Sequence, residues 1–267
     1  MSLIDRARAR LGLDGPLAAD AATLVALHRA HAETIPFENF DVLLGRPPSL
    51  DPEALAAKML DRRRGGYCFE HNSLLRAVLA GLGFAVRPLL GCVTFNLPGI
   101  RPRTHLLTLV EAGGRRWIAD VGFGGHGLVE PVPFEPGREH DAIDGRYRIR
   151  PSFDEGYEME VWRDGGWLSL YWFDLAHFRP LDIEVANWFT ATHPASPFRA
   201  RRIASLPGRA RRLNLTDAEL TIREGDRVAV RRIATESEFR LLMAGDFGLD
   251  LPEAALPPLD GLARDAA

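Results

Sequence analysis

The sequence predicts an α+β fold, and three features of its hydrophobic pattern indicate this class. Through residues 1–84, apolar residues recur at helical spacing. At Phe84 the period changes from about 3.6 to about 2, and short runs bounded by turn residues then predict an antiparallel sheet curved into a barrel. The last part combines short strands with one further helix. We therefore expect three parts, 1–84, 85–178 and 200–267, with a helix and loop over 179–199 before the last.

Composition and charge exclude several classes of function. The chain has 267 residues, of which 46% are hydrophobic and 26% charged, as in ordinary globular proteins. A net charge of −3 gives no electrostatic basis for binding nucleic acid. The first residues lack the apolar run of a signal peptide, and no segment is apolar for long enough to span a membrane. We expect a cytoplasmic protein, monomer or homodimer, without nucleic-acid or membrane partners and with its two cysteines reduced.

Four helices are predicted in the first part. They cover about Ile4–Leu11, Asp20–Thr34, Pro52–Arg62, and a run that begins near Cys68 and ends at Gly81 and Gly83. The second helix carries His28 and His31, but no third ligand stands at a suitable spacing. We therefore predict no metal site and interpret both histidines as surface or helix-edge residues.

An extended segment follows the second helix, because Pro36 disfavours helical backbone in the residue before it. This segment places Glu38 between the aromatic residues Phe37 and Phe40. A buried acid needs a partner, and Arg64, next to a glycine pair, is the partner that we expect. Such an ion pair would be structural and would hold the loop before Cys68 in place.

Short strands dominate the rest of the chain. We expect strands at 85–95, 105–110 and 116–121, a turn at 96–99, and a hairpin turn at Ala112-Gly113-Gly114. Further strands are expected at 147–150, 158–163 and 167–173, before a helix at 181–189. Strands at 202–206, 211–215, 219–223 and 228–233 precede a helix capped by Thr235 that runs to Met243. The Pro- and Ala-rich tail from Pro252 is expected to be loosely ordered.

Cys68 is the first candidate for chemistry. It follows Gly65-Gly66 and stands at the start of a helical run. The unpaired N–H groups and the dipole at a helix N-terminus favour a thiolate, which is the reactive form of cysteine. An arbitrary cysteine is more often a small buried apolar residue. Cys92, in the middle of a predicted strand beside Val93, is expected to be inert. The partners of Cys68 therefore decide its role.

Those partners come from the predicted hairpin between the second and third strands. Its turn lies midway between His105 and Asp120, so antiparallel pairing is expected to bring Asp120 roughly opposite His105. A base and the acid that orients it require this proximity. We predict a Cys-His-Asp triad in which Cys68 is the nucleophile, His105 takes its proton, and Asp120 fixes the histidine tautomer. The resting state would be a thiolate–imidazolium pair.

A glycine-rich segment, Val121-Gly122-Phe123-Gly124-Gly125-His126-Gly127, follows directly after Asp120. Glycines let the backbone approach a ligand closely, and successive N–H groups can line an anion site. The segment does not match a phosphate-binding Walker loop or the dinucleotide-binding pattern. Its position beside the acid makes it a candidate binding loop.

Together these motifs resemble the arylamine N-acetyltransferase family. The resemblance rests on Arg64-Gly65-Gly66-Tyr67-Cys68-Phe69-Glu70-His71-Asn72, Arg103-Thr104-His105, Asp120-Val121-Gly122-Phe123-Gly124, Ile35-Pro36-Phe37-Glu38-Asn39 and Ser196-Pro197-Phe198. It covers nearly the whole chain. It implies an N-terminal helical bundle carrying the cysteine, a central antiparallel β-barrel carrying the histidine and aspartate, a bridging helix, and a C-terminal α/β lid. This fold belongs to the cysteine-protease-like superfamily with Cys-His-Asp triads.

The resemblance also implies a reaction. Acetyl-CoA would be a co-substrate rather than a permanently bound cofactor, and the acceptors would be aromatic amines or hydrazines. In a ping-pong cycle Cys68 takes the acetyl group and passes it to the amine. The family implies that substrate contacts come from Phe37, Val93, Thr104, Phe123 and Phe198. It implies that CoA contacts come from Gly122, Gly124, Gly125 and the segment 187–198. We expect the Cys68 N–H to be an oxyanion donor and His71 to be a packing or edge residue.

Three other functions remain open at this stage. An amide synthase that releases or cyclises a carrier-bound polyketide would share the family resemblance and the triad. A papain- or transglutaminase-like hydrolase would share the order of Cys, His and Asp, but the Phe123 loop and the Pro36–Asn39 segment do not favour it. A non-enzymatic binding protein on this scaffold would be expected to lack a triad member.

Overall fold

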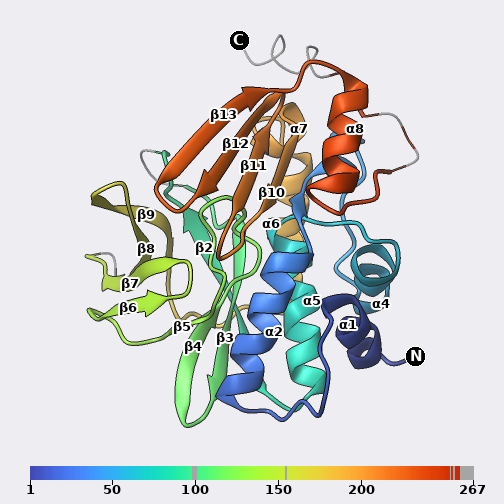
Figure 1. Cartoon of the computed structure of the whole chain (residues 1–267). Helices are drawn as coiled ribbons and strands as arrows, with labels where there is room; N and C mark the ends of the chain where they lie inside the picture. Colours follow the sequence, from blue (N-terminus) through green and yellow to red (C-terminus); the bar gives the residue numbers. More distant parts are fainter. Residues whose placement is uncertain (98–100, 154, 253, 255, 259–267) are drawn as a thin grey trace.

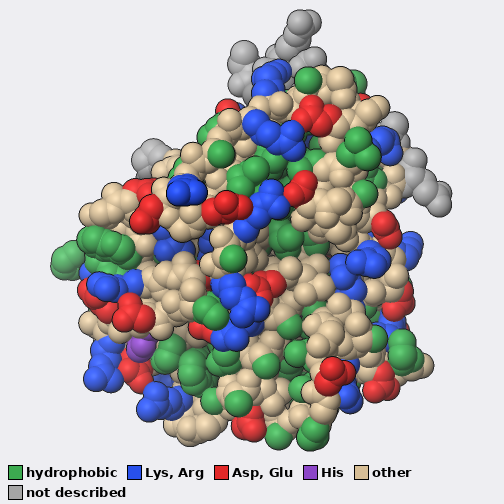
Figure 2. Space-filling view, in the orientation of Figure 1, with side chains coloured by type: hydrophobic (Ala, Val, Ile, Leu, Met, Phe, Trp, Pro, Cys, Tyr) green, Lys and Arg blue, Asp and Glu red, His purple; other side chains and the backbone are tan. Residues whose placement is uncertain are grey.

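The predicted α+β class is confirmed. The computed structural model describes residues 1–97, 101–153, 155–252, 254 and 256–258. Figure 1 shows the N-terminal helices beside a curved antiparallel sheet, with a second sheet and helix α8 above them. Basic and acidic side chains are interspersed over the face in Figure 2. Within the described residues, no helix combines the length and apolar character needed to cross a bilayer.

The first helices begin and end at residues suited to these positions. α1 (Leu3–Leu11) starts with a capping box between Ser2 and Asp5, and Asp20 caps α2 (Ala21–Thr34) by accepting from the N–H of Thr23. The third predicted helix is instead a short α4 (Pro52–Leu55) that continues as a π-helix (Ala56–Asp61). α5 (Cys68–Gly81) packs beside α2, and these helices share one apolar core. Packing against this core fixes the position of α5, and with it the position of Cys68, the first residue of that helix.

The larger sheet is nearly closed, as the predicted barrel requires. It holds eight antiparallel strands in the order β5-β4-β3-β2-β9-β8-β7-β6 around its own apolar core. Their bounds are β2 (Ala85–Val93), β3 (His105–Ala112), β4 (Arg115–Ala119), β5 (Val132–Pro133), β6 (Glu139–Ala142), β7 (Gly145–Pro151), β8 (Tyr157–Arg163) and β9 (Gly166–Phe173). The turn predicted at 96–99 falls in part on residues 98–100, which lie outside the described residues.

The register of the β3–β4 hairpin differs from our prediction. Ala112 pairs with Arg115 and Thr108 pairs with Ala119, so the turn is centred between Gly113 and Gly114. Both glycines have positive φ, 57° and 72°, as a two-residue hairpin of this kind requires. Our placement of Asp120 opposite His105 in the ladder was therefore wrong. Asp120 is the first residue past the ladder, where the backbone is free to turn.

The second sheet joins distant parts of the chain. Its order is β1-β10-β11-β12-β13, and all neighbours are antiparallel. The bounds are β1 (Phe37–Glu38), β10 (Ile203–Leu206), β11 (Arg212–Thr216), β12 (Glu219–Glu224) and β13 (Arg227–Arg232). α8 (Glu236–Gly245) and α3 (Phe40–Leu43) contribute to its apolar core. Since β1 comes from the N-terminal segment, this sheet holds Phe37 next to β10.

Two helices complete the surroundings of Cys68. They are α6 (Pro180–Thr192) and the short α7 (Pro197–Ala200). A fourth apolar cluster includes residues of β1, α5, both sheets and α6, and Cys68 is one of its members. All parts of the fold therefore meet at the start of α5. The predicted tail from Pro252 lies largely outside the described residues.

Candidate active site

The glycine pair before α5 fixes the position of Cys68. A Cβ added to Gly65 would lie 2.0 Å from the carbonyl oxygen of Pro36, and one on Gly66 would lie 2.8 Å from the Cβ of Glu70. Neither site therefore has room for a side chain. Cys68 is the first residue of α5 and is 3% exposed, and its Sγ lies 3.6 Å from the carbonyl oxygen of Thr104. The sulfur thus sits at a helix N-terminus beside the residue that precedes His105.

His105 lies between Asp120 and Cys68. Its Nε2 is 2.7 Å from Oδ2 of Asp120, and both side chains are buried. Burial alone would lower the pKa of His105, but the charge of Asp120 and the hydrogen bonds to Asp120 and Cys68 raise it to about 10. Burial alone would raise the pKa of Asp120, but His105 and hydrogen-bond donors hold it below its ordinary value. The pair is therefore a carboxylate and an imidazolium at neutral pH.

Asn72 connects α5, the helix that begins at Cys68, to Asp120. It lies one turn after Cys68 on α5. Its Nδ2 donates to Oδ1 of Asp120 at 2.8 Å and to the carbonyl of Leu106 at 2.6 Å, and its Oδ1 accepts from the N–H of Val121 at 3.1 Å. The N–H of Gly122 also donates to Oδ1 of Asp120 at 2.9 Å. Our sequence analysis gave Asn72 no role, although its spacing of four from Cys68 placed it on the same helix face.

Our interpretation of His28 and His31 as surface or helix-edge residues was wrong. They are 0% and 2% exposed, because α2 is covered both by the other helices and by the chain that follows β4. Nε2 of His31 lies 2.9 Å from Nδ1 of His71, and Nε2 of His71 lies 3.1 Å from the carbonyl oxygen of Pro36. His71 is thus a buried packing residue, and burial lowers its pKa to about 4. No cluster of three or more metal-ligating side chains occurs within the part of the chain that the structure describes.

The expected ion pair between Glu38 and Arg64 is present within a larger network. Nη2 of Arg64 lies 2.7 Å from Oε1 of Glu38 and 3.3 Å from Asp41. Lys58, the only lysine of the chain, lies 2.6 Å from Asp41 and 2.7 Å from Glu70. Burial raises the pKa of Glu70 to about 7, although Lys58 opposes the shift. The network links the π-helix, β1 and the first turn of α5 behind Cys68.

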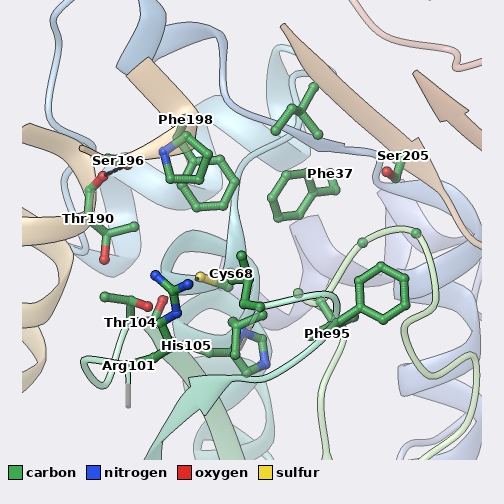
Figure 3. Close-up of a pocket in the computed structure, with 18 of the residues that line it drawn as sticks. Phe37, Cys68, Phe95, Arg101, Thr104, His105, Thr190, Ser196, Phe198 and Ser205 are labelled. Atoms are coloured by element: carbon green, nitrogen blue, oxygen red, sulfur yellow. Dashed lines mark hydrogen bonds between the residues drawn. The ribbon is translucent and has the colours of Figure 1, made fainter. Parts of the chain in front are cut away.

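A cavity of about 740 Å³ opens in front of Cys68 and His105. Figure 3 shows the two side chains at its floor, with Phe37 and Phe198 on the opposite side. The individual residues to which the resemblance assigned substrate or CoA contacts line it, and so does part of the predicted CoA segment 187–198: Phe37, Val93, Thr104, Gly122, Phe123, Gly124, Gly125, Phe189, Thr190, His193, Ala195, Ser196, Pro197 and Phe198. Sequence reasoning missed other lining residues, among them Phe95, Arg101, Ser205, Asn214 and Thr221. Asn187, at the start of the predicted CoA segment, instead binds Tyr67 and the carbonyl of Pro48.

The glycine-rich loop passes directly over the start of α5. A Cβ on Gly122 would lie 2.7 Å from the Cα of Cys68, and one on Gly125 would lie 2.9 Å from Oδ1 of Asn214. Arg212 of β11 donates to the carbonyls of Gly125 and Gly127, both at 3.0 Å. These contacts explain why the loop needs glycine at these positions. They also bring its backbone to the cavity next to the sulfur.

Comparisons with known proteins identify relatives of this chain. Residues 20–256 match the family model described as N-acetyltransferase. The arylamine N-acetyltransferase of Escherichia coli (strain K12) is 39% identical over 250 residues, which is 92% of this chain and 88% of that protein. The solved structure of arylamine N-acetyltransferase from M. tuberculosis is similar, with a TM-score of 0.90, 34% identity, and coverage of 92% of this chain and 94% of that chain.

A structure of the Mycobacterium marinum arylamine N-acetyltransferase in complex with CoA has the same fold, with a TM-score of 0.90, 30% identity, and coverage of 97% and 96%. The family model spans most of the chain, and the relatives match it over nearly its full length. The chain therefore belongs to the arylamine N-acetyltransferase family.

Proposed function

We propose that this enzyme acetylates arylamines and hydrazines with acetyl-CoA by a ping-pong mechanism through an acetyl-Cys68 thioester. The observation that carries this proposal is the position of His105, which contacts both Cys68 and the buried Asp120, while Cys68 and His105 line one large cavity. A nucleophile, a base and an orienting acid in this order are the machinery of acyl transfer. The CoA complex of the M. marinum relative supports CoA as the carrier of the acyl group.

In the first half-reaction, the Cys68 thiolate attacks the carbonyl carbon of acetyl-CoA. The carbon–sulfur bond to CoA breaks, and the leaving thiolate takes the proton of the His105 imidazolium. Acetyl-Cys68, neutral His105 and CoA thiol result. One thioester replaces another, so this step needs mainly a good nucleophile and correct positioning. We assign the N–H of Cys68 at the start of α5 to stabilise the negative oxygen of the intermediate.

In the second half-reaction, the amine nitrogen attacks the acetyl carbon of acetyl-Cys68. Neutral His105 accepts the proton of the amine, the bond to Sγ breaks, and the thiolate–imidazolium pair returns. Weakly basic aromatic amines are unprotonated at neutral pH and can attack directly. Phe37, Phe123 and Phe198, with Val93 and Thr104, would hold the aromatic ring.

The glycine-rich loop is the proposed contact for acetyl-CoA. The backbone of Gly122, Gly124 and Gly125 lines the cavity without side chains, so a long thin donor could lie against it. A cytoplasmic location supplies both acetyl-CoA and the reduced thiol that the cycle needs. Either a monomer or a homodimer fits, since one chain provides all the proposed groups.

The decisive test is intact-protein mass after brief exposure to acetyl-CoA without an amine. We expect the protein to gain the mass of one acetyl group on a peptide containing Cys68, and to lose it when an arylamine is added. Cys68→Ala should fold normally, gain no acetyl group and show no turnover, whereas Cys92→Ala should behave like the unmodified protein. Retained acetyl transfer in Cys68→Ala would overturn the nucleophile assignment. No adduct despite a reactive Cys68 would instead favour the amide synthase that takes its acyl group from a carrier protein.

A further inference from the structure

We propose that His28 is a positioning residue for the reaction, because it holds the backbone of Asp120 in the place from which its carboxylate meets His105. The inference rests on the role given to Asp120 in the proposed function. His28 lies on α2, far in sequence from all the residues discussed so far as reacting groups. Its side chain is fully buried, so it neither contacts solvent nor lines the cavity.

The contacts of His28 define its tautomer. The N–H of Asp120 donates to Nε2 of His28 at 3.0 Å, so Nε2 must be the unprotonated nitrogen. Nδ1, 3.0 Å from the carbonyl oxygen of Val129, then carries the proton and donates it. Burial lowers the pKa of His28, and the Val129 bond and the charges of Asp120, Asp144 and Glu130 only partly offset this. The ring is therefore neutral, with one acceptor and one donor, and both are used.

The unprotonated Nε2 of His28 supplies an acceptor for the backbone N–H of Asp120. The β3–β4 ladder ends at the pair Thr108–Ala119, so the N–H of Asp120 has no strand partner within it. An unpaired N–H in a fully buried position costs free energy comparable to a lost hydrogen bond. His28 supplies the acceptor from the neighbouring helix. The end of the strand is thereby fixed where the chain turns towards Cys68.

His28 also joins the two ends of the glycine-rich loop. Asp120 stands immediately before this loop and Val129 shortly after it. One imidazole thus bridges both ends, while the carboxylate of Asp120 is held by Asn72 and the N–H of Gly122. Loss of the Asp120 contact should let the carboxylate drift from Nε2 of His105. Loss of the Val129 contact should affect only the far end of the loop.

Two conservative substitutions separate these contacts. In His28→Gln the side-chain oxygen can reach the position of Nε2 and accept from Asp120, but the donor to Val129 is lost. In His28→Asn the shorter amide can keep the donor near Nδ1, but it cannot reach Asp120. We expect His28→Asn to lower kcat by about 10- to 100-fold, the range typical of groups that orient a reacting side chain. His28→Gln should keep at least tenfold more activity than His28→Asn.

A pH profile distinguishes positioning from a general loss of stability. The probe is the rate of iodoacetamide alkylation of Cys68 in the folded protein, which requires no acetyl transfer. If Asp120 moves, the imidazolium of His105 is less stabilised and favours the Cys68 thiolate less, so alkylation of His28→Asn at neutral pH should be slower than that of the unmodified protein and should increase as the pH is raised. His31→Asn, which removes another buried histidine from the same helix, should leave the profile unchanged.

The outcomes separate this inference from the function on which it rests. An unchanged alkylation profile and kcat in His28→Asn would overturn the inference, as would equal losses in His28→Asn and His28→Gln, or an equal shift in His31→Asn. Asp120→Asn measured in parallel is the reference. If Asp120→Asn has no effect, the triad itself fails. If it has a large effect and His28→Asn has none, only the role of His28 fails.

Discussion

The polar groups of Asp120 and of Asn214, which lie on two sides of Cys68, differ in how completely they are paired. Behind the sulfur, Asp120 is fully buried, both carboxylate oxygens accept hydrogen bonds, and its N–H is bound by His28. In front of it, Oδ1 of Asn214 lines the cavity and has no hydrogen-bond partner within the described residues. The paired side is arranged before substrate arrives, as electrostatic stabilisation of a transition state requires. The cavity side keeps at least this one buried oxygen without a partner.

The largest effect is expected from a change on the paired side. Asp120→Asn keeps the size of the side chain but removes the charge that holds His105 protonated and in its tautomer. We expect kcat to fall by about 10⁴-fold, as for the equivalent change in a Ser-His-Asp triad. Steady-state kinetics with an arylamine, together with circular dichroism as a folding control, would measure it. Activity within a few-fold of the unmodified enzyme would remove Asp120 from the mechanism.

The ion network behind Cys68 should matter for stability more than for chemistry. Arg64→Met leaves Glu38, which is fully buried, without its main cation. Breaking a buried pair costs about 3–5 kcal/mol, and we expect the lower end because Lys58 lies 3.9 Å from Glu38 and the N–H of Phe40 donates to it. Urea unfolding would measure the change.

The matched control for this change is Arg146→Met. Arg146 contacts two carboxylates, Asp141 and Glu139, but about half of its side chain is exposed. Exposed pairs contribute little to stability, so its unfolding midpoint should hardly move. Equal decreases in the unfolding midpoint of the two variants would show that burial does not make the Arg64 network more important for stability than an exposed ion pair.

The two cysteines offer an internal comparison of reactivity. Because the pKa of His105 is raised to about 10, its imidazolium persists at all pH values below that and favours the thiolate of Cys68. Burial instead raises the pKa of Cys92. At neutral pH we therefore expect iodoacetamide to label Cys68, which lies at a helix N-terminus beside the His105 imidazolium, faster than Cys92. Peptide mass mapping over pH 5.5–9.5 would measure both rates. If the labelling rates of both cysteines rise together only above pH 8, the result would argue against a thiolate–imidazolium pair of Cys68 and His105.

The sequence predicted some features of the molecule and not others. Helices appeared where apolar spacing and caps agreed, and Cys68, His105 and Asp120 stand in short motifs with specific neighbours. The hairpin register could not be fixed from a glycine pair alone, because moving the turn centre by one residue shifts every pair by two. His105 and Asp120 still meet, since Asp120 lies past the ladder and its side chain reaches across.

The supporting contacts were hidden because they join distant segments. His28 gave no signal on its own helix, and its burial depends on residues about a hundred positions later. The pairing of β1 with β10 and the placement of Asn214 on the cavity wall also depend on how the second sheet packs. Asn72 was the exception, since its place four residues after Cys68 was visible in the sequence. Local patterns thus predicted the candidate reacting groups more readily than the groups that hold them in place.

The smallest effect is expected on the cavity side. The ring of Phe198 lies 5.9 Å from that of Phe37 and 5.8 Å from that of Tyr67, so an arylamine ring can join an existing aromatic cluster. Phe198→Leu removes one such contact, worth about 0.5–1.5 kcal/mol, and should raise KM for an arylamine about 3- to 10-fold with little change in kcat. The KM of Phe198→Leu for hydrazine, which has no ring, should not rise. The matched control is Phe153→Leu, which alters a fully exposed phenylalanine outside the cavity lining and should leave the KM for the arylamine unchanged. A large fall in kcat with both acceptors would show instead that Phe198 helps to position Cys68, His105 or Asp120. Phe198 would then belong with the groups behind the sulfur rather than with the substrate-binding wall of the cavity.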